Sequence, residues 1–177
     1  MKEDVLLDLA AEHLQPGARV LDLGGPAIPS PLLAGRRVTV LREDEALAFL
    51  QAHADAPFDG VLTRAPSSFA PLILLLTAVR AALHEGGIAL VADLAWQTAP
   101  TPELLRAFAP APGRDKVRPI EGYEMQMEHA GFSVAGRHDV DRARWAATLA
   151  PEQRAAVEAD TRGAARFVVW VLRPASE

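Results

Sequence analysis

The chain contains 177 residues, of which half are hydrophobic and 23% are charged, a composition typical of a globular protein and incompatible with a largely disordered chain. This length predicts a single domain, 1–177. There is no cysteine, which excludes disulfides, thiolate zinc sites and cysteine nucleophiles. The net charge of −5 argues against a free-standing nucleic-acid binder, because such proteins usually carry a basic surplus.

The sequence also argues against a membrane partner. Its longest apolar run, 69–76, is far shorter than the ~18–20 residues that a spanning helix needs. The chain begins Met1-Lys2-Glu3-Asp4 with no apolar stretch behind it, so no secretory signal is visible. We therefore expect a soluble, cytoplasmic protein.

The first part of the chain alternates helix-like and strand-like segments. A helix is predicted over 3–14, where apolar residues recur at helical spacing. Strands are predicted over 19–25, 37–41 and 58–63. A helix over 45–53, with Asp44 as its N-cap, connects the second of these strands to the third.

The second part continues the alternation. A long apolar helix is predicted from Pro71 to about His84, ended by the glycines 86–87, followed by a strand over 88–93. Residues 98–119 hold five of the fourteen prolines and are expected to form a loop-rich, lid-like excursion around a short helix near 103–109. The remaining predicted elements are a helix over 121–130, strands over 132–140 and 165–172, and a helical insertion over 142–162 between those strands.

Strands that alternate with helices predict an α/β fold, with a mostly parallel sheet and helices on both faces. In such a sheet the ligand crevice lies at the carboxyl ends of the strands. Asp22, Gly24 and Gly25 follow the first strand at that place. Glycine there lets the backbone approach a ligand closely, and the Asp22 carboxylate can accept hydrogen bonds from a ligand; a glycine turn with Asp22 as a local cap explains the same residues.

Four short motifs in the same order resemble those of the class I S-adenosylmethionine-dependent methyltransferases. The motifs are Ala18-Arg-Val-Leu-Asp-Leu-Gly-Gly25, Phe58-Asp-Gly-Val-Leu-Thr63, Leu83-His-Glu-Gly-Gly-Ile-Ala-Leu-Val-Ala-Asp93 and Glu128-His-Ala-Gly-Phe-Ser-Val134. The resemblance implies a three-layer, doubly wound, Rossmann-like sheet of about six to seven strands. It also implies S-adenosylmethionine as the cofactor and Asp22, Gly24 and Gly25 as cofactor contacts.

The chain departs from the family pattern in its cofactor half. Pro26 and Ile28 stand where the family has the second and third glycines of its first loop. The acidic residue that ends the family's second strand and binds the ribose hydroxyls would fall at Arg42, with Glu43 one position later. The connection from 41 to 58 is too short for the family's third strand, so that strand is expected to be missing. Asp55 is then the candidate for the adenine contact.

Other residues give weaker indications. Arg64, directly after the third predicted strand, could meet a carboxylate of the cofactor or substrate, or could simply be exposed. Trp96 and Tyr123 could stack on an aromatic acceptor, although packing of a lid onto the domain explains them better. Like these two, Asp93 and Glu121 lie in segments that cover the substrate side in the family that the chain resembles. No residue identifies a methyl acceptor or a catalytic group, and the five histidines show no metal-ligand spacing.

Two functions from different classes follow. The first is an S-adenosylmethionine-dependent methyltransferase acting on a small molecule, with Asp22, Gly24, Gly25, Glu43 and Arg64 binding the cofactor. The second is a methyltransferase fold without catalysis that serves as a binding module; the exposed edge of the second strand could then pair with a partner or form a homodimer. A third hypothesis is a nucleotide-binding oxidoreductase. Pro26 and Ile28 disrupt the glycine motif of that class as much as they disrupt the methyltransferase loop.

Overall fold

A computed structural model describes residues 5–25, 30–53, 57–66, 71–110 and 116–176. Asp55, Pro26 and Ile28 lie outside these described residues. The helices are α1 (Val5–His13), α2 (Glu43–Ala52), α3 (Leu72–Ala82), α4 (Pro102–Ala107), α5 (Ile120–His129), α6 (Arg142–Ala146) and α7 (Pro151–Ala159), with a short 3-10 helix, η1 (Pro31–Leu33). The strands are β1 (Arg19–Leu23), β2 (Arg37–Leu41), β3 (Phe58–Arg64), β4 (Leu83–Trp96), β5 (Phe132–Asp139) and β6 (Ala165–Pro174).

The described strands form one sheet in the order β2-β1-β3-β4-β6-β5. Strands β2, β1, β3 and β4 are mutually parallel, whereas β6 runs antiparallel to both of its neighbours. The predicted mostly parallel α/β sheet is confirmed. Within the described residues, α2 is the one element between β2 and β3, as expected if the third strand of the family is missing.

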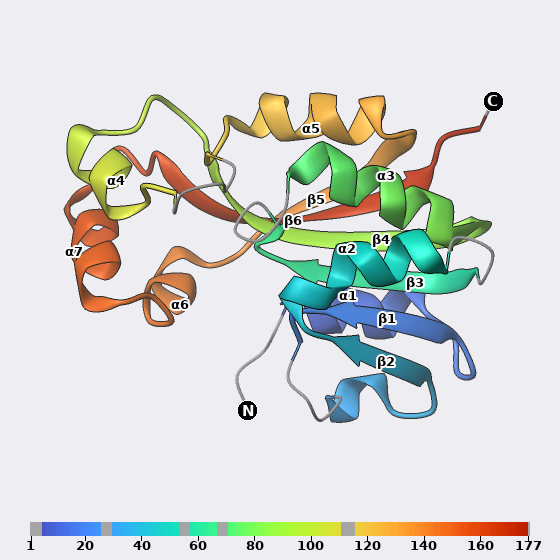
Figure 1. Ribbon diagram of the computed structural model, residues 1–177. Coiled ribbons are helices and arrows are strands. Elements are labelled where there is room, and N and C mark those ends of the chain that lie inside the picture. The colour runs from blue at the N-terminus through green and yellow to red at the C-terminus, as the bar shows by residue number, and fades with distance from the viewer. Residues whose placement is uncertain (1–4, 26–29, 54–56, 67–70, 111–115, 177) are drawn as a thin grey trace.

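Helices cover both faces of the sheet (Figure 1). Leucines of α3 and residues of α2 and α5 pack on the face that carries Leu21 and Val61. On the opposite face, α1 packs against Val20 and Leu62. Because side chains alternate along a strand, Asp22 and Arg64 share the α1 face of the sheet.

The helices α4, α6 and α7, which we call the helical cap, form a group of their own beyond the carboxyl end of β4 (Figure 1). They share a third apolar cluster with Trp96 at the end of β4. Within that cluster Phe108 stacks on Trp145, and Trp145 stacks on Phe167 of β6. The predicted lid segment 98–119 and helical insertion 142–162 therefore pack together.

Among the element boundaries that differ from those predicted, two change the role of a named residue. The α2 helix begins at Glu43 with Arg42 in the N-cap position, so Asp44 is not the N-cap but a residue of the first turn, where the helix dipole favours an acid. The α3 helix ends at Ala82, and β4 starts at Leu83 rather than at residue 88. Gly87 is thus part of the strand. A Cβ there would lie 3.0 Å from the His84 carbonyl oxygen and 3.2 Å from that of Phe58, so the close backbone approach favours glycine.

Candidate functional site

The carboxyl ends of β1 and β3 meet where the strand order reverses. The chain passes from β1 outward to β2 and then returns to the other side of β1 as β3. In open α/β sheets this reversal opens the crevice in which ligands bind. Asp22, the turn Gly24–Gly25 and Arg64 all lie at this point, so the structure brings together four of the five residues that the sequence singled out as cofactor contacts.

Asp22 and Arg64 form an ion pair across this point, in which Nη1 of Arg64 donates to Oδ1 of Asp22. The Asp22 side chain is 1% exposed and that of Arg64 is 23% exposed. A buried carboxylate is costly unless it is paired, and the guanidinium compensates it. The two side chains that were expected to bind a ligand separately therefore meet each other.

The turn after β1 needs glycine at both positions. Gly24 has a φ of 72°, in the left-handed region that glycine favours, and its N–H donates to the Leu41 carbonyl of β2 at 2.9 Å. A Cβ on Gly25 would lie 2.3 Å from Oδ2 of Asp22. The backbone thus passes directly over the carboxylate, which leaves it no room for a side chain.

The residue after Arg64 is strained. Ala65 has a φ of 46°, a conformation that costs an L-residue with a side chain roughly 1–2 kcal/mol, and its N–H donates to the Ala92 carbonyl at 2.6 Å. Such strain gathers at ligand sites, where the surrounding structure holds it in place. Nothing in the sequence indicated this feature.

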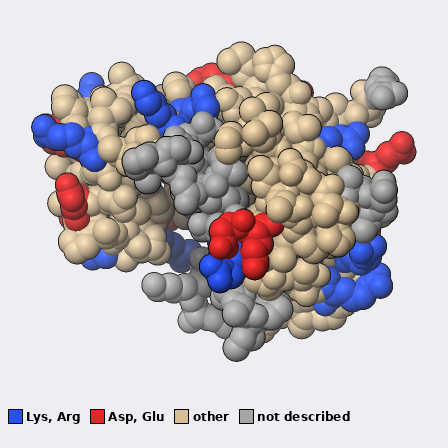
Figure 2. Space-filling view, viewed as in Figure 1, with Lys and Arg blue, Asp and Glu red and all other residues tan. Residues whose placement is uncertain are grey.

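Acidic residues border the site from α2. Arg42 follows β2, is exposed, and forms an ion pair with Asp44 at 3.0 Å; Glu43 is the first residue of the helix. Asp44 and Glu45 are exposed, and Figure 2 shows carboxylates over this end of α2, on the side toward the helical cap. The sequence showed this acidic run, but only Glu43 was singled out as a contact.

The residues expected on the substrate side are mostly buried. Asp93 lies inside β4 rather than at its end. One of its own carboxylate oxygens accepts the N–H of Leu94 at 2.8 Å. Trp96 packs edge-on against Phe108, and Tyr123 packs on Trp170 of β6. Both aromatic side chains belong to the cores, which favours their packing role over stacking on an acceptor. Glu121 is exposed on α5.

The lid-like segment carries four basic residues, Arg106, Arg114, Lys116 and Arg118, and is only partly described. Arg114 lies outside the described residues, and Lys116 is exposed. Arg106 of α4 forms an ion pair with Glu103 at 3.1 Å. Arg106 is therefore already paired with an acid of its own helix.

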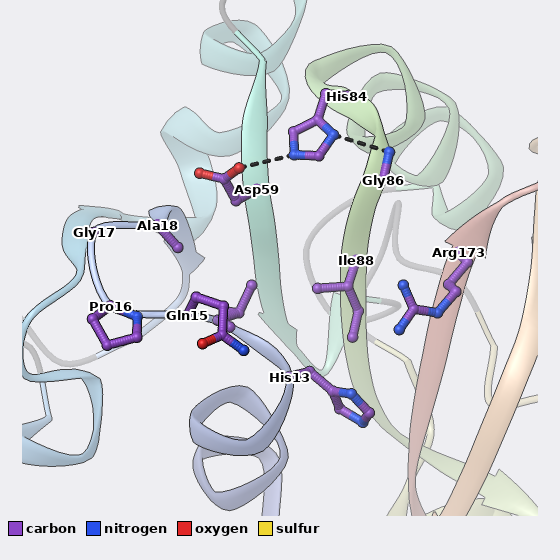
Figure 3. Close-up of a pocket in the computed structure, with 11 residues that line it drawn as sticks. His13, Gln15, Pro16, Gly17, Ala18, Asp59, His84, Gly86, Ile88 and Arg173 are labelled. Carbon is purple, nitrogen blue, oxygen red and sulfur yellow. Dashed lines mark hydrogen bonds and ion pairs between the residues drawn. The ribbon is translucent and has the colours of Figure 1, made fainter.

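A hollow with a volume of about 400 Å³ lies at the opposite end of the strands. Figure 3 shows Asp59 and His84 on its walls and Arg173 reaching in from β6. Oδ2 of Asp59 accepts the N–H of Arg19 at 2.7 Å, and Oδ1 accepts from Nε2 of His84 at 2.8 Å. Nδ1 of His84 accepts the N–H of Gly86 at 2.9 Å.

The polar pair in this hollow has a structural role. Each carboxylate oxygen of Asp59 and each ring nitrogen of His84 has a hydrogen-bond partner within the protein, and these bonds tie the starts of β1, β3 and β4 together. The N–H of Arg19, followed by the hydrogen bond and charge of His84 and the charge of Arg37, holds the pKa of Asp59 below its ordinary value despite partial desolvation. His84 is in β4 and not, as predicted, at the end of a helix.

Comparison with known proteins supports the fold but not a particular activity. No protein-family model matches the chain, and no curated protein is similar to it in sequence. The chain superposes on a SAM-dependent methyltransferase from Geobacter sulfurreducens bound to S-adenosyl-L-homocysteine, with a TM-score of 0.69 and 16% identity over 97% of this chain and 91% of the other. A geranyl diphosphate C-methyltransferase from Streptomyces coelicolor A3(2) gives a TM-score of 0.69 and 16% identity over 96% and 78% of the two chains.

The same fold also occurs in an enzyme that is named for a different reaction. The [4+2]-cyclase SpnF matches with a TM-score of 0.62 and 15% identity over 98% of this chain and 81% of its own. The protein thus has the class I S-adenosylmethionine-dependent methyltransferase fold, as the motifs predicted. At these identities the likeness defines the architecture, and the activity has to be argued from the site.

The residues at the carboxyl end of β1 fit the amino-acid end of S-adenosylmethionine. That end carries an ammonium and a carboxylate, and the site offers a carboxylate on Asp22 and a guanidinium on Arg64. The backbone at Gly25 lies directly against the Asp22 carboxylate, where a Cβ has no room. The part these residues play in binding stays a prediction.

Proposed function

We propose that the protein is an S-adenosylmethionine-dependent methyltransferase that acts on a small molecule in the cytoplasm. The observation that carries the proposal is the Asp22–Arg64 pair, with Gly25 folded over it, at the point where the strand order of a class I methyltransferase fold reverses. Neighbours in the structural comparison, among them the geranyl diphosphate C-methyltransferase, support a small-molecule substrate.

The chain's own residues would bind and orient. Asp22 would accept from the ammonium of the cofactor and Arg64 would donate to its carboxylate, while the backbone of Gly24 and Gly25 allows close approach. Glu43, at the start of α2, would accept from the ribose hydroxyls. The bound cofactor supplies an electrophilic methyl group, and transfer then depends mainly on how the acceptor is positioned.

Thermal unfolding with S-adenosylmethionine and with S-adenosylhomocysteine tests the proposal. A ligand at 100 times its dissociation constant adds about 2.7 kcal/mol to stability, which raises the melting temperature by roughly 5–10 °C for a domain of this size. We expect a rise in that range for the wild type and none for Asp22→Asn. The matched control is Asp139→Asn, which changes an exposed carboxylate on β5 and should keep the full rise.

The alternative is a binding module that keeps the fold without catalysis. It is supported by the charge of Asp22, which Arg64 already neutralises within the protein, and by Pro26 and Ile28 in the first loop. Absence of a shift at about millimolar ligand, in a protein that unfolds cooperatively, would refute the methyltransferase and leave the binding module.

A further inference from the structure

The hollow at the amino ends of the strands has an apolar floor and a polar rim. Its floor is made by Leu14 and Ile88, each 3% exposed, and its rim carries the side chains of His13, Asp59 and Arg173 (Figure 3). The volume of about 400 Å³ lies within the roughly 300–1,000 Å³ of small-molecule sites, which combine an apolar lining with a few polar groups. The hollow thus has the size and the composition of a small-molecule site.

Several hydrogen-bond acceptors in the wall of the hollow are already used by donors of the protein. Both carboxylate oxygens of Asp59 accept hydrogen bonds, as described above. Two carbonyls of the segment after α1 accept from arginines: Nε of Arg36 donates to the Leu14 carbonyl at 2.8 Å, and Nε of Arg37 donates to the Gly17 carbonyl at 3.1 Å. A cationic ligand would therefore meet a carboxylate and carbonyls that other groups already occupy.

The side chains with unused hydrogen-bonding capacity are mainly donors. The guanidinium of Arg173 reaches into the hollow from β6 (Figure 3), and it makes no hydrogen bond or ion pair with another described residue. The side-chain amide of Gln15 and the imidazole of His13, which also line the hollow, have no such partner in the same ranges. A guanidinium has only N–H donors, and their fork fits a carboxylate or a phosphate. The ligand that complements these groups is an anion.

The charges around the hollow are nearly balanced, so the preference for an anion rests on the donors of Arg173. The exposed acids Glu12 and Glu85 adjoin lining residues in the chain, but neither lines the hollow. Arg36 and Arg37 offset them on the basic side, next to the wall carbonyls to which they donate. A group with two oxygens in one plane can use the guanidinium fork twice, whereas a neutral ligand gains no charge-assisted hydrogen bond there.

We propose that this hollow binds a small organic anion, a carboxylate or phosphate group carried on an apolar body. The anionic group accepts from Arg173, with His13 and the amide of Gln15 as further donors, and the apolar body covers the floor. The site is independent of the proposed function, because the Asp22–Arg64 pair lies at the opposite end of the strands. The protein can therefore hold this anion and a cofactor at the same time.

NMR titration of the ¹⁵N-labelled protein with benzoate, phenyl phosphate and benzyl alcohol tests the proposal. We expect saturable shifts of the amides of Gln15, Gly17 and Gly86 with at least one of the two anions, with a dissociation constant of about 1 mM or below. The anion that binds more tightly identifies the preferred group. The neutral alcohol should bind at least about tenfold more weakly, because it lacks the charge that Arg173 recognises. Absence of saturation up to about 10 mM anion, or equal binding of the alcohol, would overturn the proposal.

Arg173→Gln tests the residue that selects the anion. Arg173 is exposed, so the variant should keep the melting temperature of the wild type, while its affinity for the anion falls at least about tenfold. The matched control is Arg106→Gln, which makes the same change of charge on an exposed side chain of α4 in the helical cap and should bind the anion like the wild type. Wild-type affinity in Arg173→Gln would refute the assigned role of the guanidinium.

The same titration in Asp22→Asn separates this site from the proposed cofactor site. The anion should shift the same amides with unchanged affinity, whether or not the variant has lost its response to S-adenosylmethionine. Loss of anion binding in a variant that stays folded would place the anion at the carboxyl ends of the strands and overturn the hollow as its site. A failure of the methyltransferase proposal, by contrast, leaves the result of this titration unaffected.

Discussion

At the scale of single residues, the Asp22–Arg64 pair has two consequences. It satisfies a carboxylate that is 1% exposed, which would otherwise be a costly buried charge. It also means that a ligand reaching Asp22 must share or replace the guanidinium. If the proposed cofactor binds here, it would exchange one charge pair for another, and its affinity would depend on how well it supplies both a cation and an anion.

Asp59 gives a residue-scale prediction about acid stability. Its pKa in the folded protein is below the ordinary value of 3.8, chiefly because its carboxylate accepts the N–H of Arg19 and then because of His84. A lowered folded-state pKa stabilises the protein above the unfolded-state pKa, and this contribution is lost as the pH falls through the folded-state value. The wild type should thus be more stable than Asp59→Asn at pH ~7, with the difference shrinking below pH ~4.

Urea unfolding of both proteins at several pH values measures this difference. Asp8→Asn is the control, because Asp8 is an exposed residue of α1; its stability should follow that of the wild type. A gap between wild type and Asp59→Asn that stays constant down to pH ~2.5 would contradict the assigned role of the carboxylate.

At the scale of elements, glycine acts in opposite ways at the two ends of α5. Gly122, in the first turn, does not have a positive φ, and a Cβ there would meet its nearest atom at an ordinary 3.6 Å. Gly131 follows the C-cap with a φ of 85°, which ends the helix in the left-handed conformation. The first glycine is therefore replaceable by alanine, and the second is required by the backbone.

We expect Gly122→Ala to raise the free energy of unfolding by about 0.5–1 kcal/mol, because alanine loses less conformational entropy in a helix. Gly131→Ala should lower it by roughly 1 kcal/mol, because the left-handed conformation disfavours a Cβ. Chemical denaturation of the two variants, with identical slopes against denaturant, measures both changes. Destabilisation by Gly122→Ala would mean that the first turn of α5 has no room for a methyl group.

At the scale of the whole molecule, the helical cap has an apolar cluster separate from the two clusters of the sheet. Its helices are tied to one another by Arg142 of α6, which donates to the Val157 and Asp160 carbonyls at the end of α7. Gln153 of α7 donates to the Ala107 carbonyl of α4 at 3.3 Å. These hydrogen bonds stay within the cap, and its apolar cluster reaches the sheet through Trp96 of β4 and Phe167 of β6. We expect the cap to open as a unit that separates from the sheet at these two residues.

Trp145 tests this independence, since it stacks on both Phe108 and Phe167 in the centre of the cap cluster. Trp145→Ala should cost about 3–5 kcal/mol locally and lower hydrogen-exchange protection of cap amides at least about 100-fold. The amides of β1 and β3 should change little. A uniform loss of protection across cap and sheet would show that the two unfold together.

The sequence predicted the order of strands and helices well because hydrophobic periodicity and terminal glycines mark them. It also placed Asp22, Gly24 and Gly25 at the carboxyl end of the first strand, because a strand that ends in glycines can be recognised from the sequence alone. The pairing of Asp22 with Arg64 was not predictable, because it joins residues 42 apart whose contact depends on the strand order. Gly87 was misread for a related reason: a glycine that ends a helix and one that permits close contact within a strand look alike in a sequence.

The position of β6 has a consequence for how the chain is made. It pairs with β4 from Ala89 to Trp96 and also with β5 from Phe132 to Asp139, yet it is the last of the six described strands to leave the ribosome. Until residue 174 has emerged, the free side of β4 is unpaired and β5 has no neighbour in the sheet. The sheet is therefore completed only after residue 174 has emerged from the ribosome, and a chain cut before residue 165 would expose two strand edges to chaperones and proteases.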